Sequence, residues 1–452
     1  MAPPHVLVLP FPAQGHVIPM IELSHYLADH GVKVTFVNTE LNHRLILGAL
    51  ATTGDTNLGG VNMVSIPDGL GDSASRTDLG RLTDSFSKVM PGELEKLILR
   101  MGAGGDEEGI SWLIADVNMA WSFPVATRLG VRAAGFCPSS ATMFATRIRI
   151  PELIRDGVID EDGRPRRPGA FRLAPGVAPV MDAAEISWNR AGDPAGQPFI
   201  FQLILRNNAA THLAETIVCN SVQELEPGTF ALFPGRVVPV GPLSSDKPVI
   251  GSFWAQDATC ATWLDARPAN SVVYVAFGSI AAFDAAQLVE LAEGLALTDR
   301  PFLWVARPGS AGQAHELLLD RIRRLAGPRG CVVSWCPQRR VLAHPSVACF
   351  VTHCGWNSTV EAVASGVPML CWPYFADQFL NQRYICDVWR TGVQVVVAGS
   401  GTGRVERDAV RAKVEELIGD EELKERARAL RDVARRAVGD GGSSRRNLKR
   451  WE

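Results

Sequence analysis

Two polar residues that can exchange a proton follow two apolar runs of the chain. His16 comes after HVLVLPF (5–11), and Asp116 ends GISWLIAD (109–116). Such runs are typical of buried parallel strands, whose carboxyl ends meet at one edge of a sheet. We therefore expect His16, in the loop before a helix starting at Val17, to lie close to Asp116. A histidine oriented by a carboxylate is suited to act as a general base toward a hydroxyl group.

A second cluster of polar residues lies in THCGWNSTVEA, Thr352 to Ala362, between two further apolar runs. The pattern predicts a strand-to-helix turn with Gly355 at the bend and a helix that opens at Asn357 and Ser358. The N–H groups at a helix start favour an anion, and a glycine lets the backbone approach it closely. This stretch could therefore hold a diphosphate without a lysine or a metal.

The same stretch also allows a purely structural interpretation. Ser358 and Glu361 have the spacing of a capping box, in which the two side chains would satisfy N–H groups at the helix start. A capping box does not require the neighbouring His353, Trp356 and Asn357, so the combination favours a binding site.

The alternation of apolar runs with helical segments predicts two α/β domains. A chain of 452 residues is too long for one core, and a segment rich in Pro, Gly and Ser follows Pro239. We expect an N-terminal domain at 1–240, a linker at 241–262, a C-terminal domain at 263–436 with an amphipathic helical end from Arg404, and a tail at 437–452. The predicted strands are 5–11, 32–38, 109–116 and 131–137 in the first domain and 271–279, 301–307, 330–335, 347–353 and 367–373 in the second.

Composition excludes several classes of protein. The formal net charge of −3 leaves no basic surplus for nucleic acid, and nine cysteines without metal-ligand spacing suggest neither a zinc site nor a disulfide framework. The chain starts without a signal-peptide pattern and contains no apolar stretch long enough for a membrane span, so we expect a cytoplasmic protein. The acidic triplet Asp160, Glu161 and Asp162 lies among Pro and Arg residues and is predicted to be an exposed loop rather than a metal site.

The segment from Trp335 to Gln378, WCPQRRVLAHPSVACFVTHCGWNSTVEAVASGVPMLCWPYFADQ, closely resembles the signature box of plant secondary-product glycosyltransferases that use UDP-sugars (family 1). The resemblance extends over most of the chain, through PFPAQGHVIPM, a D....W...VA pattern at Asp116, VAFGS, PFLWVARP and a late GGSS. The box departs from the commoner pattern in having Cys336 where Ala is usual. The resemblance implies an α/β protein of the GT-B fold, with two doubly wound Rossmann-like domains facing across a cleft.

The resemblance also implies a role for each polar position of the box. Trp335 would stack on uracil, with the backbone of Cys336 beside the base, and Gln338 and Glu361 would contact the ribose. The diphosphate would be held by His353, Gly355, Asn357 and Ser358, helped by Ser279. Trp356, Asp377 and Gln378 would line the sugar, and a glutamine at the last box position resembles the glucose users. No metal or other cofactor is implied.

These expectations combine into one reaction. Glucose would pass from UDP-glucose, with inversion, to a hydroxyl of a small hydrophobic plant metabolite such as a flavonoid, a phenylpropanoid or a hormone-like aglycone, giving a β-glucoside. His16 would be the base and Asp116 would orient it. The alternatives are a UDP-sugar-binding sensor without catalysis and a UDP-sugar epimerase on the same fold.

The acceptor pocket and the assembly are predicted less directly from the sequence. The resemblance suggests a monomer whose tail packs back on the N-terminal domain, with UDP-glucose and the acceptor as its partners. Candidate acceptor-lining residues, each equally compatible with ordinary core, are Met119, Phe136, Met143, Phe144, Met181 and Trp188.

Overall fold

The computed structural model describes residues 3–53, 58–71, 76, 78–102, 109–177, 179–243, 251–257, 259–279, 284–306, 313–395 and 404–451, with the side chains of 53 and 313–318 left out. The chain divides into two compact units. Unit 1 comprises Met1–Trp254, Phe375–Asp377 and Arg436–Glu452, and unit 2 comprises Ala255–Tyr374 and Gln378–Arg435. The end of the predicted linker forms the start of a helix, α9 (Thr259–Asp265).

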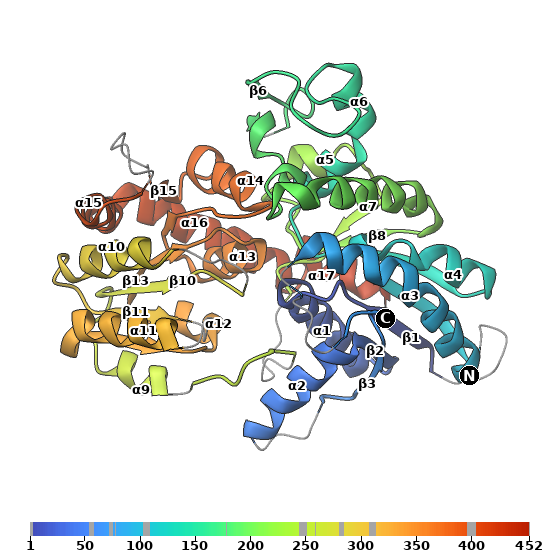
Figure 1. The fold of residues 1–452 in the computed structure, drawn as a ribbon, viewed down its shortest axis with the longest axis horizontal. Coiled ribbons are helices and arrows are strands. Elements are labelled where there is room, and N and C mark those ends of the chain that lie inside the picture. Colours follow the sequence, from blue (N-terminus) through green and yellow to red (C-terminus); the bar gives the residue numbers. More distant parts are fainter. Residues whose placement is uncertain are drawn as a thin grey trace. The chain divides into compact units, whose positions relative to one another are not determined.

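Unit 1 is built on a parallel sheet of seven strands in the order β3-β2-β1-β4-β5-β8-β9 (Figure 1). All four strands predicted for this part of the sequence are confirmed. The strands are β1 (His5–Leu9), β2 (Lys33–Thr39), β3 (Val61–Ile66), β4 (Ile110–Asp116), β5 (Arg132–Cys137), β8 (Ile217–Cys219) and β9 (Val237–Pro239).

Helices cover both faces of this sheet because its strands are apolar on both sides. Along β1, Val6 and Val8 pack with residues of the first helix, whereas Leu7 and Leu9 pack with the core on the opposite face. One face carries α1 (Gln14–Asp29), α2 (Glu40–Thr53) and α17 (Ser443–Leu448), and the other carries α3 (Leu79–Met101), α4 (Ser122–Arg128), α5 (Ala141–Ile148), α7 (Gln197–Ala210) and α8 (Pro227–Phe230). The remaining elements of the unit are η1 (Val117–Met119), α6 (Ile150–Arg155), a small antiparallel pair of β6 (Ala170–Phe171) and β7 (Met181–Asp182), and short 3-10 turns.

Unit 2 repeats this architecture with six parallel strands in the order β12-β11-β10-β13-β14-β15. The five strands predicted here are likewise confirmed. The strands are β10 (Val272–Ala276), β11 (Phe302–Val305), β12 (Gly330–Val333), β13 (Val347–Thr352), β14 (Met369–Cys371) and β15 (Gly392–Gln394). The helices are α10 (Ala285–Ala296), α11 (Gln313–Ala326), α12 (Gln338–Leu342), α13 (Trp356–Ser365), α14 (Gln378–Arg383) with a π-helical turn at Tyr384–Val388, α15 (Arg407–Gly419) and α16 (Glu421–Val438).

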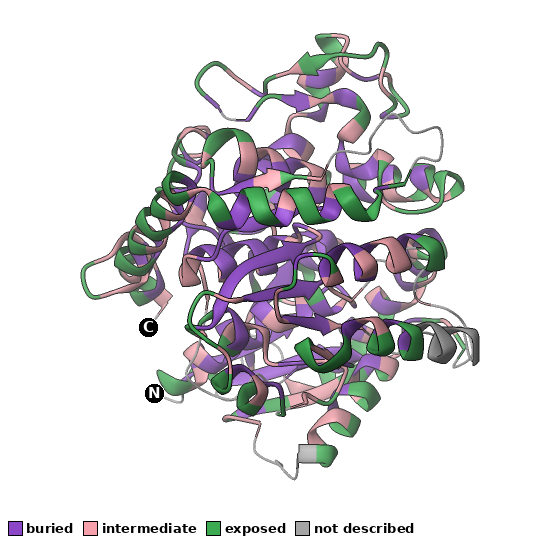
Figure 2. Ribbon diagram, turned by 90° about the vertical axis from the view of Figure 1, so that its left-hand side faces the viewer, coloured by how far each residue is buried: buried purple, intermediate pink, exposed green. Residues whose placement is uncertain are grey.

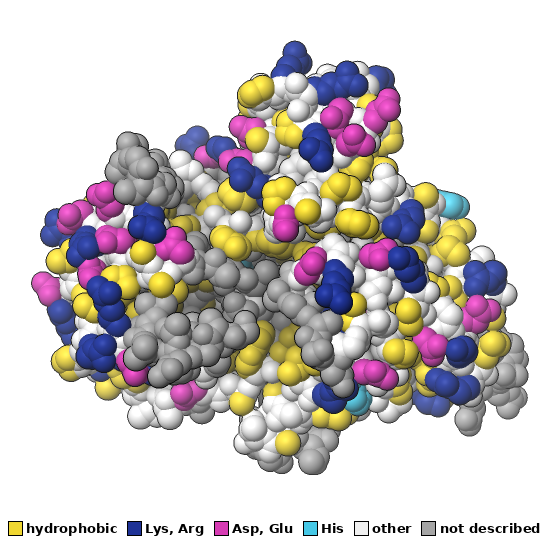
Figure 3. Space-filling model, in the orientation of Figure 1, with side chains coloured by type: hydrophobic (Ala, Val, Ile, Leu, Met, Phe, Trp, Pro, Cys, Tyr) yellow, Lys and Arg dark blue, Asp and Glu magenta, His cyan; other side chains and the backbone are white. Residues whose placement is uncertain are grey.

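The strands form the interior and the charged residues lie outside. Figure 2 shows the strands of both sheets as mostly buried, with exposed residues on the outer sides of the helices. On the face drawn in Figure 3, basic and acidic side chains are interspersed rather than gathered by sign. Within the described part of the chain, no helix has the length and apolar character needed to cross a membrane.

Each sheet reverses its strand order once. In unit 1 the chain moves outward from β1 through β2 to β3 and then returns to β4 on the other side of β1. In unit 2 the same reversal lies between β10 and β13. Loops at the carboxyl ends of the two central strands diverge at such a point, which is where open α/β sheets bind ligands.

Two predicted helix boundaries are wrong. The first helix starts at Gln14 rather than Val17, because the carbonyl of Ala13 already accepts from the N–H groups of His16 (2.9 Å) and Val17 (3.0 Å). The helical end from Arg404 to Arg436 is two helices, α15 and α16, separated at Asp420, whose Oδ1 accepts from the N–H of Leu423 (2.8 Å) and so caps α16.

The tail belongs to unit 1 and is fixed there by polar contacts. Ser444 Oγ donates to the carbonyl of Gly241 (2.7 Å), and Asn447 Nδ2 donates to the carbonyl of Pro239 (2.8 Å). The ring of Trp451 packs 5.8 Å from that of Trp112, centroid to centroid. The two polar contacts attach α17 to the edge strand β9 and the residues after it, and the ring contact joins the end of the tail to the central strand β4.

Glu226 fixes the start of α5, the helix that carries Arg147. Its buried carboxylate accepts from the N–H groups of Ala141 (2.9 Å) and Thr142 (2.8 Å) and from Ser221 Oγ (2.5 Å). Burial raises the pKa of Glu226, while these hydrogen bonds act in the opposite direction. The carboxylate satisfies several buried donors at once.

We expect Glu226→Ala to lower the free energy of unfolding by about 3 kcal/mol, because several buried donors would lose their acceptor. Urea denaturation followed by circular dichroism measures this loss. Glu224→Ala, at an exposed position two residues away, is the matched control and should change stability by less than about 0.5 kcal/mol. A loss below about 1 kcal/mol for Glu226→Ala would contradict this role.

Candidate functional site

His16 and Asp116 meet at the point where the strand order of unit 1 reverses. His16 is the third residue of α1, which follows β1, and Asp116 is the last residue of β4. The His16 Nδ1 atom lies 2.6 Å from Asp116 Oδ2. The Asp116 side chain is fully buried, whereas 29% of the His16 side chain is exposed. With Nδ1–H donating to the carboxylate, Nε2 is left as the ring atom that can accept a proton.

Asp116 accepts two further hydrogen bonds, both from Asn118 in η1. The backbone N–H and the side-chain Nδ2 of Asn118 each lie 2.8 Å from Asp116 Oδ1. The Oδ1 atom of Asn118 in turn accepts from Arg147 Nη1. Both carboxylate oxygens of Asp116 are therefore engaged, which fixes the plane of the group that orients His16.

Asn118 and Arg147 are not among the site residues predicted from the sequence. An asparagine two residues after an aspartate, as in DVN, is a recognised turn pattern, because the aspartate can accept from the N–H two residues on. Arg147 stands in the otherwise uncharged helix ATMFATRI, where a charge needs a partner. Neither signal identifies the partner, since the contacts come from separate elements.

In unit 2, the glycine-flanked residue His353 lies where the strand order reverses. It follows β13, and Gly278 follows the neighbouring strand β10. A Cβ atom added to Gly278 or to Gly355 would lie 2.5 Å from His353 Nε2, so only glycine leaves room for this ring. Gly278 also has a φ of +68°, and Cys354 has a φ of +64°. Backbone strain of this kind is common at functional sites.

The His353 ring is neutral at physiological pH. Burial lowers its pKa to about 4, and a hydrogen bond with the backbone of Ala276 acts weakly in the opposite direction. The Nδ1 atom is buried and has no hydrogen-bond partner within the described part of the chain. A neutral imidazole has a single N–H, so the ring adds no charge here and can donate to only one acceptor.

The capping box proposed for Ser358 and Glu361 is not formed, and that structural interpretation is wrong. Helix α13 begins at Trp356, earlier than predicted, and its N-cap is Gly355, which has no side chain to cap it. Instead, Gln338 Nε2 donates to Ser358 Oγ (2.9 Å) and to Glu361 Oε2 (2.8 Å). The amide of Gln338 thus joins α12 to α13.

Tyr274, which was not predicted from the sequence, holds the side-chain amide of Gln338 in place. Its hydroxyl donates to Gln338 Oε1 (3.3 Å) and lies 3.4 Å from Cys336 Sγ. Its ring stacks on Phe350 at 4.8 Å between centroids. Contact with Cys260 and burial raise the pKa of the Cys336 thiol, so this buried sulfur stays protonated and unreactive.

The other predicted binding residues follow β10, β12, β13 or β14 in the chain. Trp335 is half-buried, and its carbonyl accepts from the N–H of Asp257 (2.9 Å). Trp356 is almost fully buried, with its ring 6.3 Å from that of Trp389. Gln378 Oε1 accepts from the N–H of Tyr374 (2.8 Å). Ser279 follows Gly278, and Asn357 and Asp377 are partly exposed.

Asp377 and Gln378 fall into different units although they are adjacent in the chain. Asp377 belongs to unit 1 with Phe375 and Ala376, and Gln378 belongs to unit 2. Ala376 has a φ of +49°, and its N–H donates to the carbonyl of Arg190 (2.9 Å). The predicted roles of these residues toward a sugar remain predictions.

The six candidate acceptor-lining residues are all buried, with exposed fractions of 7% or less. They do not share one surface: Met119 and Phe144 belong to the core on the face of α3 and α7, whereas Phe136 belongs to the core on the face of α1. Trp188 donates its indole N–H to the carbonyl of Gly163 (2.7 Å) and packs on Phe201, and Thr146 Oγ1 lies 3.9 Å from Met181 Sδ. Met143 lies beside Phe144 on α5. Their part in acceptor binding also remains a prediction.

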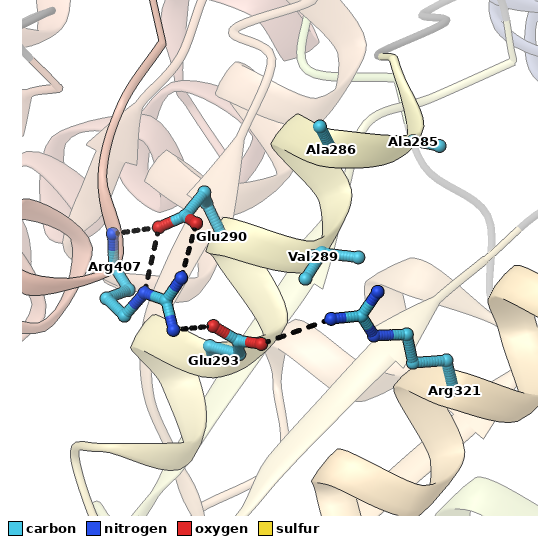
Figure 4. A pocket seen from close by; sticks show the side chains of 7 residues that line it. All are labelled: Ala285, Ala286, Val289, Glu290, Glu293, Arg321 and Arg407. Carbon is cyan, nitrogen blue, oxygen red and sulfur yellow. Dashed lines mark hydrogen bonds and ion pairs between the residues drawn. The ribbon is translucent and has the colours of Figure 1, made fainter.

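Other candidate features lie away from these groups. The acidic triplet is a turn in which Asp160 Oδ1 accepts from the N–H groups of Asp162 and Arg164, with Glu161 and Asp162 exposed as predicted. A surface hollow of about 530 Å³ on α10 holds an ion-pair cluster in which Arg407 bridges Glu290 and Glu293 (Figure 4). It includes none of the predicted site residues. Among the described residues, no three His, Cys, Asp or Glu side chains are grouped to hold a metal.

The lowered pKa of His353 predicts a pH dependence of stability. Unfolding restores the ordinary pKa of 6.5, so between about pH 6.5 and 4 the unfolded chain binds more protons than the native one. Stability from this group is therefore complete above pH 6.5 and falls as pH falls toward 4. We expect His353→Gln to reduce the pH dependence of the urea midpoint over this range, measured at several pH values.

The control for that measurement is His212→Gln, at an exposed histidine, which should leave the wild-type pH dependence in place. Equal pH dependence in the wild type and in His353→Gln would contradict burial of a neutral ring.

Comparisons with known proteins agree with this geometry. Residues 249–435 match the family model "UDP-glucoronosyl and UDP-glucosyl transferase". The chain is 41% identical to UDP-glycosyltransferase 83A1 of Arabidopsis thaliana, covering 100% of this chain and 96% of the relative. It is 33% identical to (R)-mandelonitrile beta-glucosyltransferase of Prunus dulcis, covering 98% and 95% of the two chains. The crystal structure of Os79 from O. sativa in complex with UDP superposes with a TM-score of 0.81 at 28% identity, covering 99% and 100%.

These matches confirm the GT-B fold of two Rossmann-like units and the use of a UDP-sugar as donor substrate. A match of this identity over the whole chain also establishes the kind of reaction, the transfer of a glycosyl group. The protein therefore belongs to the UDP-glycosyltransferase family of plants.

Proposed function

We propose that the protein transfers glucose from UDP-glucose, with inversion, to a hydroxyl group of a small hydrophobic metabolite, and that His16 is the general base. The observation that carries the proposal is the 2.6 Å contact between His16 Nδ1 and the buried carboxylate of Asp116. It leaves Nε2 of a partly exposed ring as the proton acceptor at a ligand-binding edge of the sheet.

The base acts while the acceptor attacks. A histidine has an ordinary pKa near 6.5 and a phenol near 10, so complete deprotonation before attack would cost about 5 kcal/mol. The proton moves to Nε2 as the hydroxyl oxygen bonds to the anomeric carbon and the bond to UDP breaks. Asp116 stabilises the imidazolium that forms, since its carboxylate is fixed by three hydrogen bonds.

The leaving UDP is assigned to the group at the start of α13. A helix N-terminus with a glycine cap offers N–H groups and a positive dipole end to a diphosphate. His353 adds an uncharged donor, and Glu361 and Gln338 supply polar atoms suited to ribose hydroxyls. Trp335 offers an aromatic face to uracil.

The acceptor class rests on relatives. Two relatives are named for small acceptors or products, (R)-mandelonitrile in Prunus dulcis and linamarin in Manihot esculenta. We include flavonoids, phenylpropanoids and hormone-like aglycones in this class.

His16→Ala tests the base directly. We expect the rate of glucosyl transfer to fall by about 10² to 10⁴, because general base catalysis is lost, while UDP affinity stays within a factor of about two. Mass spectrometry of products from UDP-glucose and a panel of hydroxyl acceptors measures transfer, and calorimetry measures UDP binding. His30→Ala, at an exposed position in the C-cap of the same helix, is the control; wild-type turnover in His16→Ala would rule out the assigned base.

Gly355→Ala tests the assignment of the diphosphate. The added Cβ would lie 2.5 Å from His353 Nε2 and displace the ring. We expect UDP affinity to fall by about tenfold or more, which corresponds to about 1.4 kcal/mol. Gly419→Ala, with no atom within 4 Å of its added Cβ, should bind UDP like the wild type. Unchanged affinity in Gly355→Ala would exclude His353 and Gly355 from the diphosphate site.

A further inference from the structure

The charge of Asp116 needs more compensation than His16 alone provides. The Asp116 side chain is fully buried, and an ionised carboxylate is costly to bury without an opposite charge. Without another cation nearby, the positive charge closest to this carboxylate would be that of a protonated His16 ring. A protonated His16 could no longer accept a proton from an acceptor hydroxyl.

A cation lies two hydrogen bonds away from Asp116, on α5. Arg147 Nη1 donates to Asn118 Oδ1, and Asn118 Nδ2 donates to Asp116 Oδ1 (2.8 Å). Arg147 Nε is buried and has no hydrogen-bond partner within the described residues. Burial lowers the pKa of Arg147, and Cys137, Asp116 and Asp377 act in the opposite direction. A guanidinium nevertheless stays charged, because it does not lose its proton under the conditions that proteins meet.

The direction of this chain of hydrogen bonds is determined. A guanidinium has only donors, so the Asn118 atom that faces Arg147 must be its oxygen, and its amide nitrogen must face Asp116. Adjacent residues of α7 hold both backbones in place. Asn207 Nδ2 donates to the carbonyl of Asn118 (2.8 Å), and Asn208 Nδ2 donates to the carbonyl of Arg147 (2.7 Å).

We propose that Arg147 is a positioning residue which, through Asn118, supplies the counter-charge of Asp116 and so keeps His16 neutral and able to accept a proton. The inference rests on the proposed function, in which His16 is the base. Arg147 need not touch the substrate for this role.

The charge arrangement explains why a cation is placed behind the carboxylate. A positive charge near Asp116 stabilises its ionised form without protonating His16, whereas a neutral residue there would leave the carboxylate to draw a proton onto the ring. Among the described residues, the titratable groups that interact electrostatically with Arg147 are Cys137, Asp116 and Asp377. His16 in turn contacts Asp116.

The test compares Arg147→Gln, which keeps a hydrogen-bond donor without the charge, with Arg147→Lys, which keeps the charge. We expect the acid limb of kcat/KM to move upward by about one pH unit in Arg147→Gln, so that activity relative to wild type falls by up to about tenfold on the acid side of the profile and returns toward the wild-type value on the alkaline side. Arg147→Lys should keep the wild-type profile. The ratio to wild type at each pH removes the ionisation of the acceptor itself.

A matched control separates this role from general support of the helix. Asn208→Ala removes the hydrogen bond to the Arg147 carbonyl but leaves the guanidinium and Asn118 in place. The acid limb of its kcat/KM profile should therefore lie at the same pH as in wild type. Loss of activity that is equal at every pH in Arg147→Gln, or an equal shift in Arg147→Lys, would overturn the proposal.

A spectroscopic readout does not depend on turnover. The proton NMR signal of the His16 ring Cε1–H, assigned by its absence in His16→Ala, is followed against pH in the protein without substrate. We expect its chemical shift to reach the value of the neutral ring at a higher pH in Arg147→Gln than in wild type. If Arg147→Gln does not fold, Asn118→Ala breaks the bridge with Arg147 present and should move the same signal upward.

The two hypotheses fail in different ways. An unmoved His16 signal in folded Arg147→Gln, or in folded Asn118→Ala where that variant is used, would overturn the role of Arg147 whatever the enzyme's activity. Undiminished transfer by His16→Ala would instead overturn the proposed base and leave the measured coupling between Arg147 and His16 as it stands.

Discussion

Parallel pairing between strands that are distant in the sequence determines where the polar groups of both units lie. Leu9 at the end of β1 pairs with Ala115, next to Asp116, and Ala276 at the end of β10 pairs with Thr352, next to His353. The carboxyl ends of these strands are therefore level, and the loops that follow them start side by side. His16 and Asp116 meet for this reason in unit 1, and Gly278 and His353 meet for the same reason in unit 2.

The polar groups at the carboxyl edge differ in charge between the two units. In unit 1 a fully buried carboxylate lies beside a partly exposed histidine. Three hydrogen bonds engage the carboxylate and a guanidinium lies beyond Asn118, while α7 fixes the backbones that carry Asn118 and Arg147. A buried charge network of this kind restricts the orientation of its members, because each lost bond would leave an uncompensated group in the interior.

In unit 2 the groups near the start of α13 are arranged around neutral donors. Burial keeps His353 uncharged, and two glycines leave the space that its ring occupies. The amide nitrogen of Gln338 donates to Ser358 and Glu361, the two side chains that a capping box would have used. Its amide oxygen accepts from Tyr274. The helix start is thus left with a glycine N-cap, which suits an anion better than a self-capped helix would.

The sequence by itself determined the α/β class, nine of the strands, and the two stretches that carry His16, Asp116 and the box from Trp335 to Gln378, since apolar runs and polar residues at strand ends are local patterns. It did not reveal the six-residue strand β3, whose middle residues are not buried, or β8, β9 and β15, which have three residues each. It also did not give the true starts of α1 and α13, which depend on a few backbone hydrogen bonds. Only the tertiary structure decided the partners: Asn118 and Arg147 behind Asp116, and Tyr274 behind Gln338. Those contacts join elements far apart in the chain, and the identity of a residue does not specify which distant side chain will complete its hydrogen bonds or balance its charge.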